Sequence, residues 1–297
     1  MTTVHYVWWG LPTQPHHIKA ANDTPNKIAQ ACGTVHDIHY WRMNGTFRPT
    51  LNAQLNTHVV TDPAEIIRNT PAWHGQGIAI RNIVNTLTRY NAYAAAKDLV
   101  SLLVLYRHGG YYFDTTTLVR PLDRNLNSLP TNYVGPKIIF RGANRTHSFT
   151  KIDDRSPMAT YNFGRVGNKT LPAVDVWAMY APPQHKAIAL ALESYIDRAR
   201  NFGLDRYPAT KRALAPAVPV SINDVMNSQN KTIRNRILGT LIIASVQEGL
   251  QKETSHHATS WSIQDVTGTP PTGCEGAVTY CTDLRLYKRH AGFWRNG

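Results

Sequence analysis

The sequence has 297 residues, of which 42% are hydrophobic and 17% charged, enough for one large α/β domain or two small ones with a sizeable core. The 32 Lys and Arg residues against 19 Asp and Glu leave a formal charge of +13, which favours acidic partners such as a nucleotide, a nucleic acid, a phosphorylated glycan or an anionic membrane face. A solvated basic surface explains the charge equally well. Three cysteines exclude a dense disulfide framework, although one Cys274 to Cys281 bridge stays open, and no apolar run reaches transmembrane length.

The first elements alternate between strand and helix. Residues 4–9, VHYVWW, form a β-branched and aromatic run that stops at a Gly-Leu-Pro sequence, which predicts a strand and a turn. Residues 15–31 favour a surface helix and residues 36–41 a second strand, the βαβ opening of an α/β fold. The polar stretch 42–71, interrupted by glycine and prolines, predicts loops and short elements.

The most informative segment is residues 93–118, YAAAKDLVSLLVLYRHGGYYFDTTTL. Its first half predicts a helix that faces a core, because apolar side chains recur at helical spacing. These are Ala92, Ala95, Ala96, Leu99, Leu102, Leu103 and Tyr106. The opposite face is also small or apolar, so we expect this helix to be covered on more than one side. An ionised Asp98 in that setting needs a partner.

The second half of this segment predicts a turn and a strand. Gly109 and Gly110 are expected to end the helix, since glycine adopts the left-handed conformation that closes it. Residues 111–113 are aromatic and favour a short strand that ends at Asp114. In α/β sheets ligands collect outside the carboxyl ends of the strands, so a ligand site is predicted at Asp114.

The pattern A-A-x-x-D-L-x-x-x-x-x-L-Y-x-x-G-G-x-Y-x-D-T in this segment resembles the core of the DxD-type glycosyltransferases. That family includes the sugar-transferring large clostridial cytotoxins and the fungal outer-chain mannosyltransferases. The resemblance implies an α/β protein of the GT-A type nucleotide-sugar transferase fold, with a Rossmann-like mixed sheet flanked by helices. It also implies a single domain over residues 1–297, with room for helical insertions around 185–255.

The resemblance further implies roles for individual residues. Asp98 would hold hydroxyl groups of the nucleotide-sugar donor, and Asp114 would meet the metal and the diphosphate. Tyr112 and Thr116 would lie beside them in the donor site. The family's first strand, written I-H-x-x-W, aligns its tryptophan with Trp8, whose ring is expected to stack on the base while the next tryptophan points to the other face of the strand.

One position departs from the family. Thr116 stands where the family has a second aspartate, so the motif is D-T-T rather than D-T-D. A threonine hydroxyl is a weaker, neutral ligand for the expected cation, Mn²⁺ or Mg²⁺, which prefers carboxylate and water oxygens. Three interpretations stay open: Asp114 binds the cation with other oxygens, basic residues hold the diphosphate instead, or the chain has lost catalysis.

The rest of the chain adds further elements and a second family signal. Strands are predicted near 134–140 and within 160–180, and helices at 186–200 and 233–250.

The family places a histidine a few residues before S-W near its carboxyl end. His290 with Trp294 is favoured over His257 with Trp261 as the match. The resemblance implies that this segment closes over the donor, with His290 on the cation or phosphate and the Trp294 indole N–H on the diphosphate oxygen that gains charge. Basic residues flank this end and could neutralise the diphosphate if the metal ion binds weakly.

The predicted function is transfer of a sugar from a UDP- or GDP-type donor to a hydroxyl of a protein or glycan. The resemblance to the family implies that the anomeric configuration of the sugar is retained. The start, MTTVHYVWWGLP, shows no signal peptide, which predicts a cytoplasmic protein, or a toxin or effector module delivered without a classical signal. The alternatives are a catalytically silent protein that binds a nucleotide or an anionic polymer, and nucleic-acid binding through charge alone. No phosphate-binding loop, dinucleotide fingerprint, zinc-protease motif or serine-hydrolase elbow supports another chemistry.

Overall fold

The computed structural model describes residues 2–10, 23, 25–30, 36–43, 55–73, 75–115, 117–119, 138–140, 148–151, 159–162, 165–166, 169–170, 174–201, 203–205, 241–242, 245–246, 248–249, 252, 262–265, 279–281 and 286–288. Its helices are η1 (Pro63–Ile67), η2 (Pro71–Trp73), α2 (Gly77–Arg89), α3 (Tyr93–His108) and α4 (Lys186–Asn201). Its strands are β1 (Thr2–Trp8), β2 (His36–Met43), β3 (Leu55–Val60), β4 (Gly110–Phe113), β5 (Thr117–Val119), β6 (Ile138–Phe140), β7 (Ser148–Lys151), β8 (Ala159–Asn162), β9 (Arg165–Val166), β10 (Lys169–Thr170), β11 (Val174–Ala181), β12 (Ser262–Asp265), β13 (Thr279–Cys281) and β14 (Leu286–Lys288).

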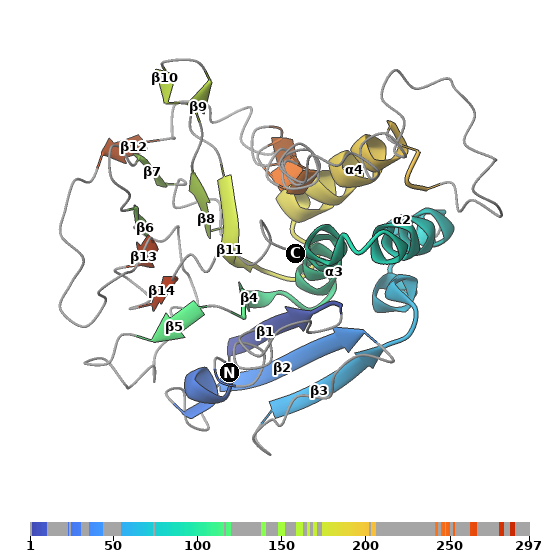
Figure 1. Cartoon of the computed structure of the whole chain (residues 1–297), viewed down its shortest axis with the longest axis horizontal. Coiled ribbons are helices and arrows are strands. Elements are labelled where there is room, and N and C mark those ends of the chain that lie inside the picture. The colour runs from blue at the N-terminus through green and yellow to red at the C-terminus, as the bar shows by residue number, and fades with distance from the viewer. Residues whose placement is uncertain are drawn as a thin grey trace.

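The main sheet has six strands within the described part of the chain, in the order β3-β2-β1-β4-β11-β8 (Figure 1). β3, β2, β1 and β4 run parallel to one another, while β11 runs antiparallel to both of its neighbours. Helices flank this sheet. The chain is therefore a mixed α/β protein, which is the class that the sequence predicts.

Strand β1 is buried on both faces. Its side chains alternate, so Val4 and Tyr6 point to one face of the sheet and His5 and Val7 to the other, and all four are at most 1% exposed. Parallel strands are commonly covered on both faces. This explains why the strand appears in the sequence as a continuous β-branched and aromatic run.

The helices α2, α3 and α4 lie together on one side of the main sheet (Figure 1). α3 is central, because it contacts β1 and β4 as well as α2 and α4. From Ala95 to Tyr106, Lys97 is the one residue of α3 that is not buried. The expectation that this helix is covered on more than one side is confirmed. No helix among the described residues combines the length and hydrophobicity that a membrane span requires.

Several other predicted elements can be compared with the structure. The helix predicted at 186–200 is confirmed as α4, and strands occur at 138–140 and 174–181 as expected. Of the helices predicted at 15–31 and 233–250, only parts are described, and those parts are helical.

The short elements predicted in the stretch 42–71 occur as β3, of 6 residues, and η1, of 5 residues. The prediction did not place β3 in the main sheet, where it lies. β3 lies at the sheet edge, and only Leu55 and Val60 at its two ends are buried. The alternation that marks a half-buried strand is therefore missing from its sequence.

A second sheet joins the carboxyl-terminal part of the chain to the segment after Asp114. Its order in the described residues is β5-β14-β13-β6. β14 runs antiparallel to β5, with Lys288 opposite Thr117. The chain thus returns at Lys288 to a point three residues beyond Asp114.

Four histidines and a tryptophan form a cluster between the main sheet and the end of α3. We call His5, His39, His58, His108 and Trp41 the histidine cluster. The Trp41 ring lies 4.1 Å from the His58 ring and 5.1 Å from the His108 ring between centroids. A hydrogen bond of 2.6 Å joins His39 Nδ1 to His58 Nε2. These side chains come from β1, β2, β3 and α3, so the cluster ties the helix end to three strands.

The hydrogen bonds of His5 require a neutral imidazole. Trp41 Nε1 donates to His5 Nδ1 at 3.2 Å, which leaves His5 Nε2 to donate to the carbonyl oxygen of Gly109 at 2.8 Å. This arrangement requires an unprotonated Nδ1. Burial lowers the pKa of His5 to about 3, and burial with the nearby Arg107 charge lowers that of His108 to about 4.

Candidate functional site

Two glycines turn the chain from α3 into β4. Gly109 has a φ of 65° and Gly110 a φ of 88°, values that glycine adopts without a steric penalty. A Cβ atom on Gly109 would lie 2.4 Å from Pro183 Cδ, and one on Gly110 would lie 2.4 Å from the carbonyl oxygen of Thr3. Because the chain reverses here, β4 runs back along α3. The residue after β4, Asp114, therefore lies beside the early turns of α3.

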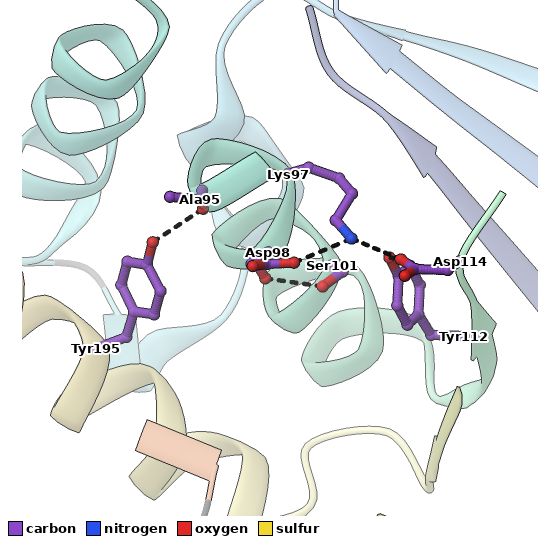
Figure 2. Close-up of polar contacts among 7 residues, drawn as sticks. All are labelled: Ala95, Lys97, Asp98, Ser101, Tyr112, Asp114 and Tyr195. Atoms are coloured by element: carbon purple, nitrogen blue, oxygen red, sulfur yellow. Dashed lines mark hydrogen bonds and ion pairs between the residues drawn. The ribbon is translucent and has the colours of Figure 1, made fainter. Parts of the chain in front are cut away.

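Three charged side chains meet at this place (Figure 2). The ammonium nitrogen of Lys97 lies 2.5 Å from Asp114 Oδ1 and 3.0 Å from Asp98 Oδ1. Tyr112 adds its hydroxyl, which donates to Asp114 Oδ1 at 2.7 Å. We call Lys97, Asp98, Tyr112 and Asp114 the charged cluster. It brings a carboxylate from the helix and one from the strand end onto a single ammonium.

The electrostatics of the charged cluster keep its lysine charged and its tyrosine neutral. Burial acts to lower the pKa of Lys97, but the carboxylates of Asp114 and Asp98 outweigh it and raise that pKa well above its ordinary value. Burial and the Asp114 charge raise the pKa of Tyr112. The side chains of the three ions are between 12% and 20% exposed, so the ions are largely but not completely removed from water.

The backbone of α3 is fixed around this cluster. Ser101 Oγ donates to the carbonyl oxygen of Asp98 at 2.7 Å, and the hydroxyl of Tyr195 on α4 donates to the carbonyl oxygen of Ala95 at 2.8 Å (Figure 2). Both hydrogen bonds are buried, and the side chain of Tyr195 is inaccessible to solvent. The second bond connects α4 to the turn of α3 that carries Lys97 and Asp98.

The two adjacent tryptophans at the carboxyl end of β1 differ in burial and in hydrogen-bond partner. Trp9 is buried in the core, and its indole N–H donates to Thr88 Oγ1 on α2 at 2.9 Å. Trp8 is half-buried at the carboxyl end of β1, and its N–H donates to the carbonyl oxygen of Gly10 at 3.1 Å. β1 and β4 are parallel neighbours, so Trp8 and Asp114 lie at the same edge of the sheet. Base stacking on Trp8 stays a prediction.

A divalent cation fits the described residues poorly. Metal–oxygen bonds of Mg²⁺ are about 2.1 Å long, and the ion needs several oxygen ligands. Asp114 Oδ1 already accepts from Lys97 and Tyr112, so a metal at this oxygen would stand directly against an ammonium. In the described ranges, no group of three or more His, Cys, Asp or Glu side chains is arranged to hold a metal ion. The described residues therefore do not fit Mn²⁺ or Mg²⁺ while Lys97 is in place.

Three of the predicted site residues, Thr116, His290 and Trp294, lie outside the described residues, so their roles stay predictions. What is described is the strand that leads to the last two. β14 ends at Lys288, which pairs with Thr117, three residues after Asp114. Asp98, Tyr112 and Asp114 are brought together. Their assignment to a donor site also stays a prediction.

Lys97 was missed by the sequence analysis. Asp98 needs a partner, and that partner is its own neighbour in the chain. Adjacent residues on a helix do not normally face each other, which is why spacing gave no signal for this pair. The available signal was chemical, because Lys97 is the basic residue closest in sequence to Asp98 in an otherwise small and apolar segment.

Comparisons with known proteins do not show a family for this chain. No family model matches the sequence, and no curated protein matches it. Among solved structures, the chain is similar to one described as PaToxG glycosyltransferase, with 13% identity and a TM-score of 0.40 over 84% of this chain and 87% of the other. It is also similar to the UDP-bound glycosyltransferase domain from the YGT toxin, with 10% identity and a TM-score of 0.47 over 88% and 78%. The ligand-free form of that domain gives 10% identity and a TM-score of 0.48 over 87% and 79%.

Proposed function

We propose that this chain is a glycosyltransferase that moves a sugar from a UDP- or GDP-type nucleotide sugar to a hydroxyl group on a protein or glycan. The observation that carries the proposal is the convergence of Asp98 and Asp114 on one ammonium at the carboxyl end of β4. The segment that makes this geometry is also the segment whose residues resemble the DxD-type glycosyltransferases.

The chemistry of the charged cluster suits a sugar diphosphate better than a simple anion. Carboxylates accept hydrogen bonds from sugar or ribose hydroxyls, and an ammonium donates to phosphate oxygens. A nucleotide sugar presents both kinds of group within a few bonds of each other. A site for nucleic acid alone would present cations without two carboxylates among them.

In the proposed reaction, the bond between the anomeric carbon of the sugar and the diphosphate breaks, and the nucleoside diphosphate leaves with the electron pair. The acceptor oxygen bonds to the anomeric carbon, and its proton passes to the departing diphosphate, with retention of configuration. Asp98 orients hydroxyl groups of the donor, Asp114 faces the diphosphate side, and Trp8 stacks on the base. His290 and Trp294 close over the donor and exclude water.

The proposal extends to the setting in which the enzyme works. The basic charge of +13 suits an acceptor on an anionic surface as well as the acidic donor. The sequence-based prediction allows two settings. The chain is delivered as a toxin or effector module, or it assembles glycans in the cytoplasm.

The test is sugar release from a panel of UDP- and GDP-sugars, followed by product analysis. Release should be measurable for one donor and should fall by roughly 100-fold or more in Asp114→Asn, because that variant keeps the shape of the side chain and removes its charge. Asp197→Asn on α4 is the matched control, since that carboxylate is 70% exposed and lies outside the charged cluster. It should leave the rate unchanged.

A binding protein without catalysis is the second candidate, and Thr116 in place of an acidic residue is the observation that favours it. Saturable binding of a nucleotide sugar that Asp114→Asn weakens, together with no sugar release from any donor, would establish that candidate. Release at equal rates in the wild type and in Asp114→Asn would contradict both.

A further inference from the structure

We propose that Lys97 is the resident cation of the charged cluster, and that its ammonium replaces a divalent metal ion in holding the donor diphosphate. This inference rests on the proposed function and names a residue that the sequence analysis did not assign. It predicts donor binding that is independent of Mn²⁺ and Mg²⁺. It also predicts that Lys97 itself keeps a metal ion away from Asp114.

The position of the ammonium is the first argument. Lys97 Nζ lies within 3.0 Å of a carboxylate oxygen from α3 and of one from the end of β4. A metal ion bound to both of these Oδ1 atoms would compete with the ammonium for the same space. Tyr112 reinforces the arrangement, because its hydroxyl donates to the same Asp114 oxygen and its ring centroid lies 5.7 Å from Nζ.

The charge of the cluster is the second argument. Two carboxylates and one ammonium give a formal charge of −1. Three carboxylates around one divalent ion would give the same charge, but Thr116 supplies a neutral hydroxyl where a third carboxylate would stand. Without a carboxylate at the motif position of Thr116, the described side chains offer a divalent ion fewer anionic ligands than the family motif would, and an Oδ1 atom of each described carboxylate already holds the ammonium.

The chemistry of lysine is the third argument. An ammonium has three N–H donors on a flexible stem, so it can keep a carboxylate contact and turn another donor to a diphosphate oxygen. The Lys97 side chain is 20% exposed, and Lys97 is the one residue between Ala95 and Tyr106 that is not buried. The diphosphate would thus meet a positive charge that is already in place before the donor arrives.

Mn²⁺ alone is the first probe, measured by calorimetric titration of the whole chain freed of metal with a chelator. Wild-type protein should show no Mn²⁺ site that depends on Asp114, so its titration should match that of Asp114→Asn. Lys97→Met removes the ammonium but keeps most of the stem. It should bind Mn²⁺ at least about tenfold more tightly than the wild type, since the repelling charge is gone. The double variant Lys97→Met/Asp114→Asn should lose that gain.

Two control variants make this result specific. Lys186→Met removes an exposed lysine at the start of α4 and should leave Mn²⁺ binding unchanged. Lys97→Arg keeps the positive charge and should exclude Mn²⁺ as the wild type does. A wild-type Mn²⁺ site that Asp114→Asn abolishes would overturn the inference, and so would a Lys97→Met variant that binds Mn²⁺ no better than the wild type.

Nucleotide binding provides a second measurement that does not depend on the folding of a variant. For UDP and for GDP, the wild-type affinity in excess chelator should equal that in 1 mM Mn²⁺ within about twofold. A difference this small means that Mn²⁺ leaves the binding free energy almost unchanged. A gain of about tenfold or more with Mn²⁺ would overturn the inference. If neither nucleotide nor any nucleotide sugar binds, the proposed function fails, while the Mn²⁺ titrations still decide whether Lys97 excludes a metal.

Discussion

The two ends of α3 carry polar clusters of opposite character. The charged cluster lies near the beginning of the helix and holds two carboxylates on one ammonium. The histidine cluster lies at its end, about 16 Å further along the axis by helical rise, and burial lowers the pKa values of its His5 and His108 imidazoles. Both contact the main sheet, the first beyond the carboxyl end of β4 and the second beside the beginning of that strand.

This difference separates a site suited to ligand binding from one suited to stability. In the histidine cluster, ring stacking and hydrogen bonds hold the side chains to one another, and the Asp37 carboxylate lies 3.1 Å from His39 Nε2. In the charged cluster, three ions are held in partial burial, which is unfavourable unless each is paired. Ions kept in that state can exchange a partner for a ligand group of the same charge. The carboxyl end of β4 is thus the end at which we expect binding.

The largest effect should come from the turn that positions both clusters. Gly110→Ala places a Cβ atom against the carbonyl oxygen of Thr3 at a φ of 88°. We expect the free energy of unfolding to fall by about 3 kcal/mol or more, as measured by urea denaturation. Both clusters should be disturbed, because His5 donates to the carbonyl oxygen of Gly109 and Asp114 follows β4 directly.

Gly75→Ala is the matched control for this substitution. A Cβ atom on Gly75 would meet nothing within 4 Å, and the residue is exposed. The unfolding free energy should change by less than about 0.5 kcal/mol. Equal losses in Gly75→Ala and Gly110→Ala would show that the tight approach of β4 to β1 is not what stabilises this region.

Acid should lower the free energy of unfolding through the histidine cluster. The pKa of His5 in the folded chain is about 3, below the value of about 6.5 expected when unfolded, so the unfolded state binds the proton first as the pH falls. Stability contributed by neutral His5 is therefore complete above about pH 6.5 and is lost as the pH falls toward 3. Between pH 6.5 and 5, this one group should remove roughly 2 kcal/mol from the free energy of unfolding.

The pH effect can be assigned with two variants measured by urea denaturation at pH 7, 6 and 5. His5→Gln does not titrate and should show a shallower pH dependence than the wild type. His39, His58 and His108 face His5, and the lowered pKa values of His58 and His108 will leave part of the slope in place. His185→Asn, outside the histidine cluster, should keep the wild-type slope. A wild-type stability that is flat from pH 7 to 5 would contradict the neutral cluster.

The sequence predicts α3 and β4 well because their signals are local. Helical spacing, two glycines and an aromatic strand all occur within 26 residues. β3 was predicted only as an unspecified short element, because an edge strand with exposed Asn56, Thr57 and Val59 lacks alternation. α2 was not predicted, although Ile80, Ile83 and Leu87 recur at helical spacing and are fully buried. That signal was present and was not used.

The sequence predicts where single residues of the site lie, but not the contact that joins them. The burial of Asp98 and its need for a partner follow from the apolar helix around it, and the position of Asp114 at a strand end follows from the aromatic run before it. The shared ammonium does not follow, since it depends on how tightly the turn at Gly109 and Gly110 folds β4 back along α3. Side-chain reach across that turn is a three-dimensional property.

A smaller effect should come from the support of the charged end by α4. Tyr195→Phe removes the buried hydroxyl that donates to the carbonyl oxygen of Ala95, and we expect a loss of about 1 kcal/mol in the free energy of unfolding. Tyr93→Phe removes an exposed hydroxyl that donates to Asn91 Oδ1, so its loss should be below about 0.5 kcal/mol. Urea denaturation of both variants compares them directly. Equal losses would mean that α4 does not hold this turn of α3 through Tyr195.

The central claim is that Asp98 and Asp114 act on one donor in one site, and a double-mutant cycle on donor binding tests it most directly. The affinity for the nucleotide sugar selected from the panel would be measured for the wild type, Asp98→Asn, Asp114→Asn and the double variant. Because the two carboxylates share Lys97, the losses in binding free energy should be non-additive by about 0.5 kcal/mol or more. The contrary result is a loss in each single variant, with a double variant whose loss equals the sum of the two within about 0.3 kcal/mol. The two carboxylates would then work independently, which would contradict the claim.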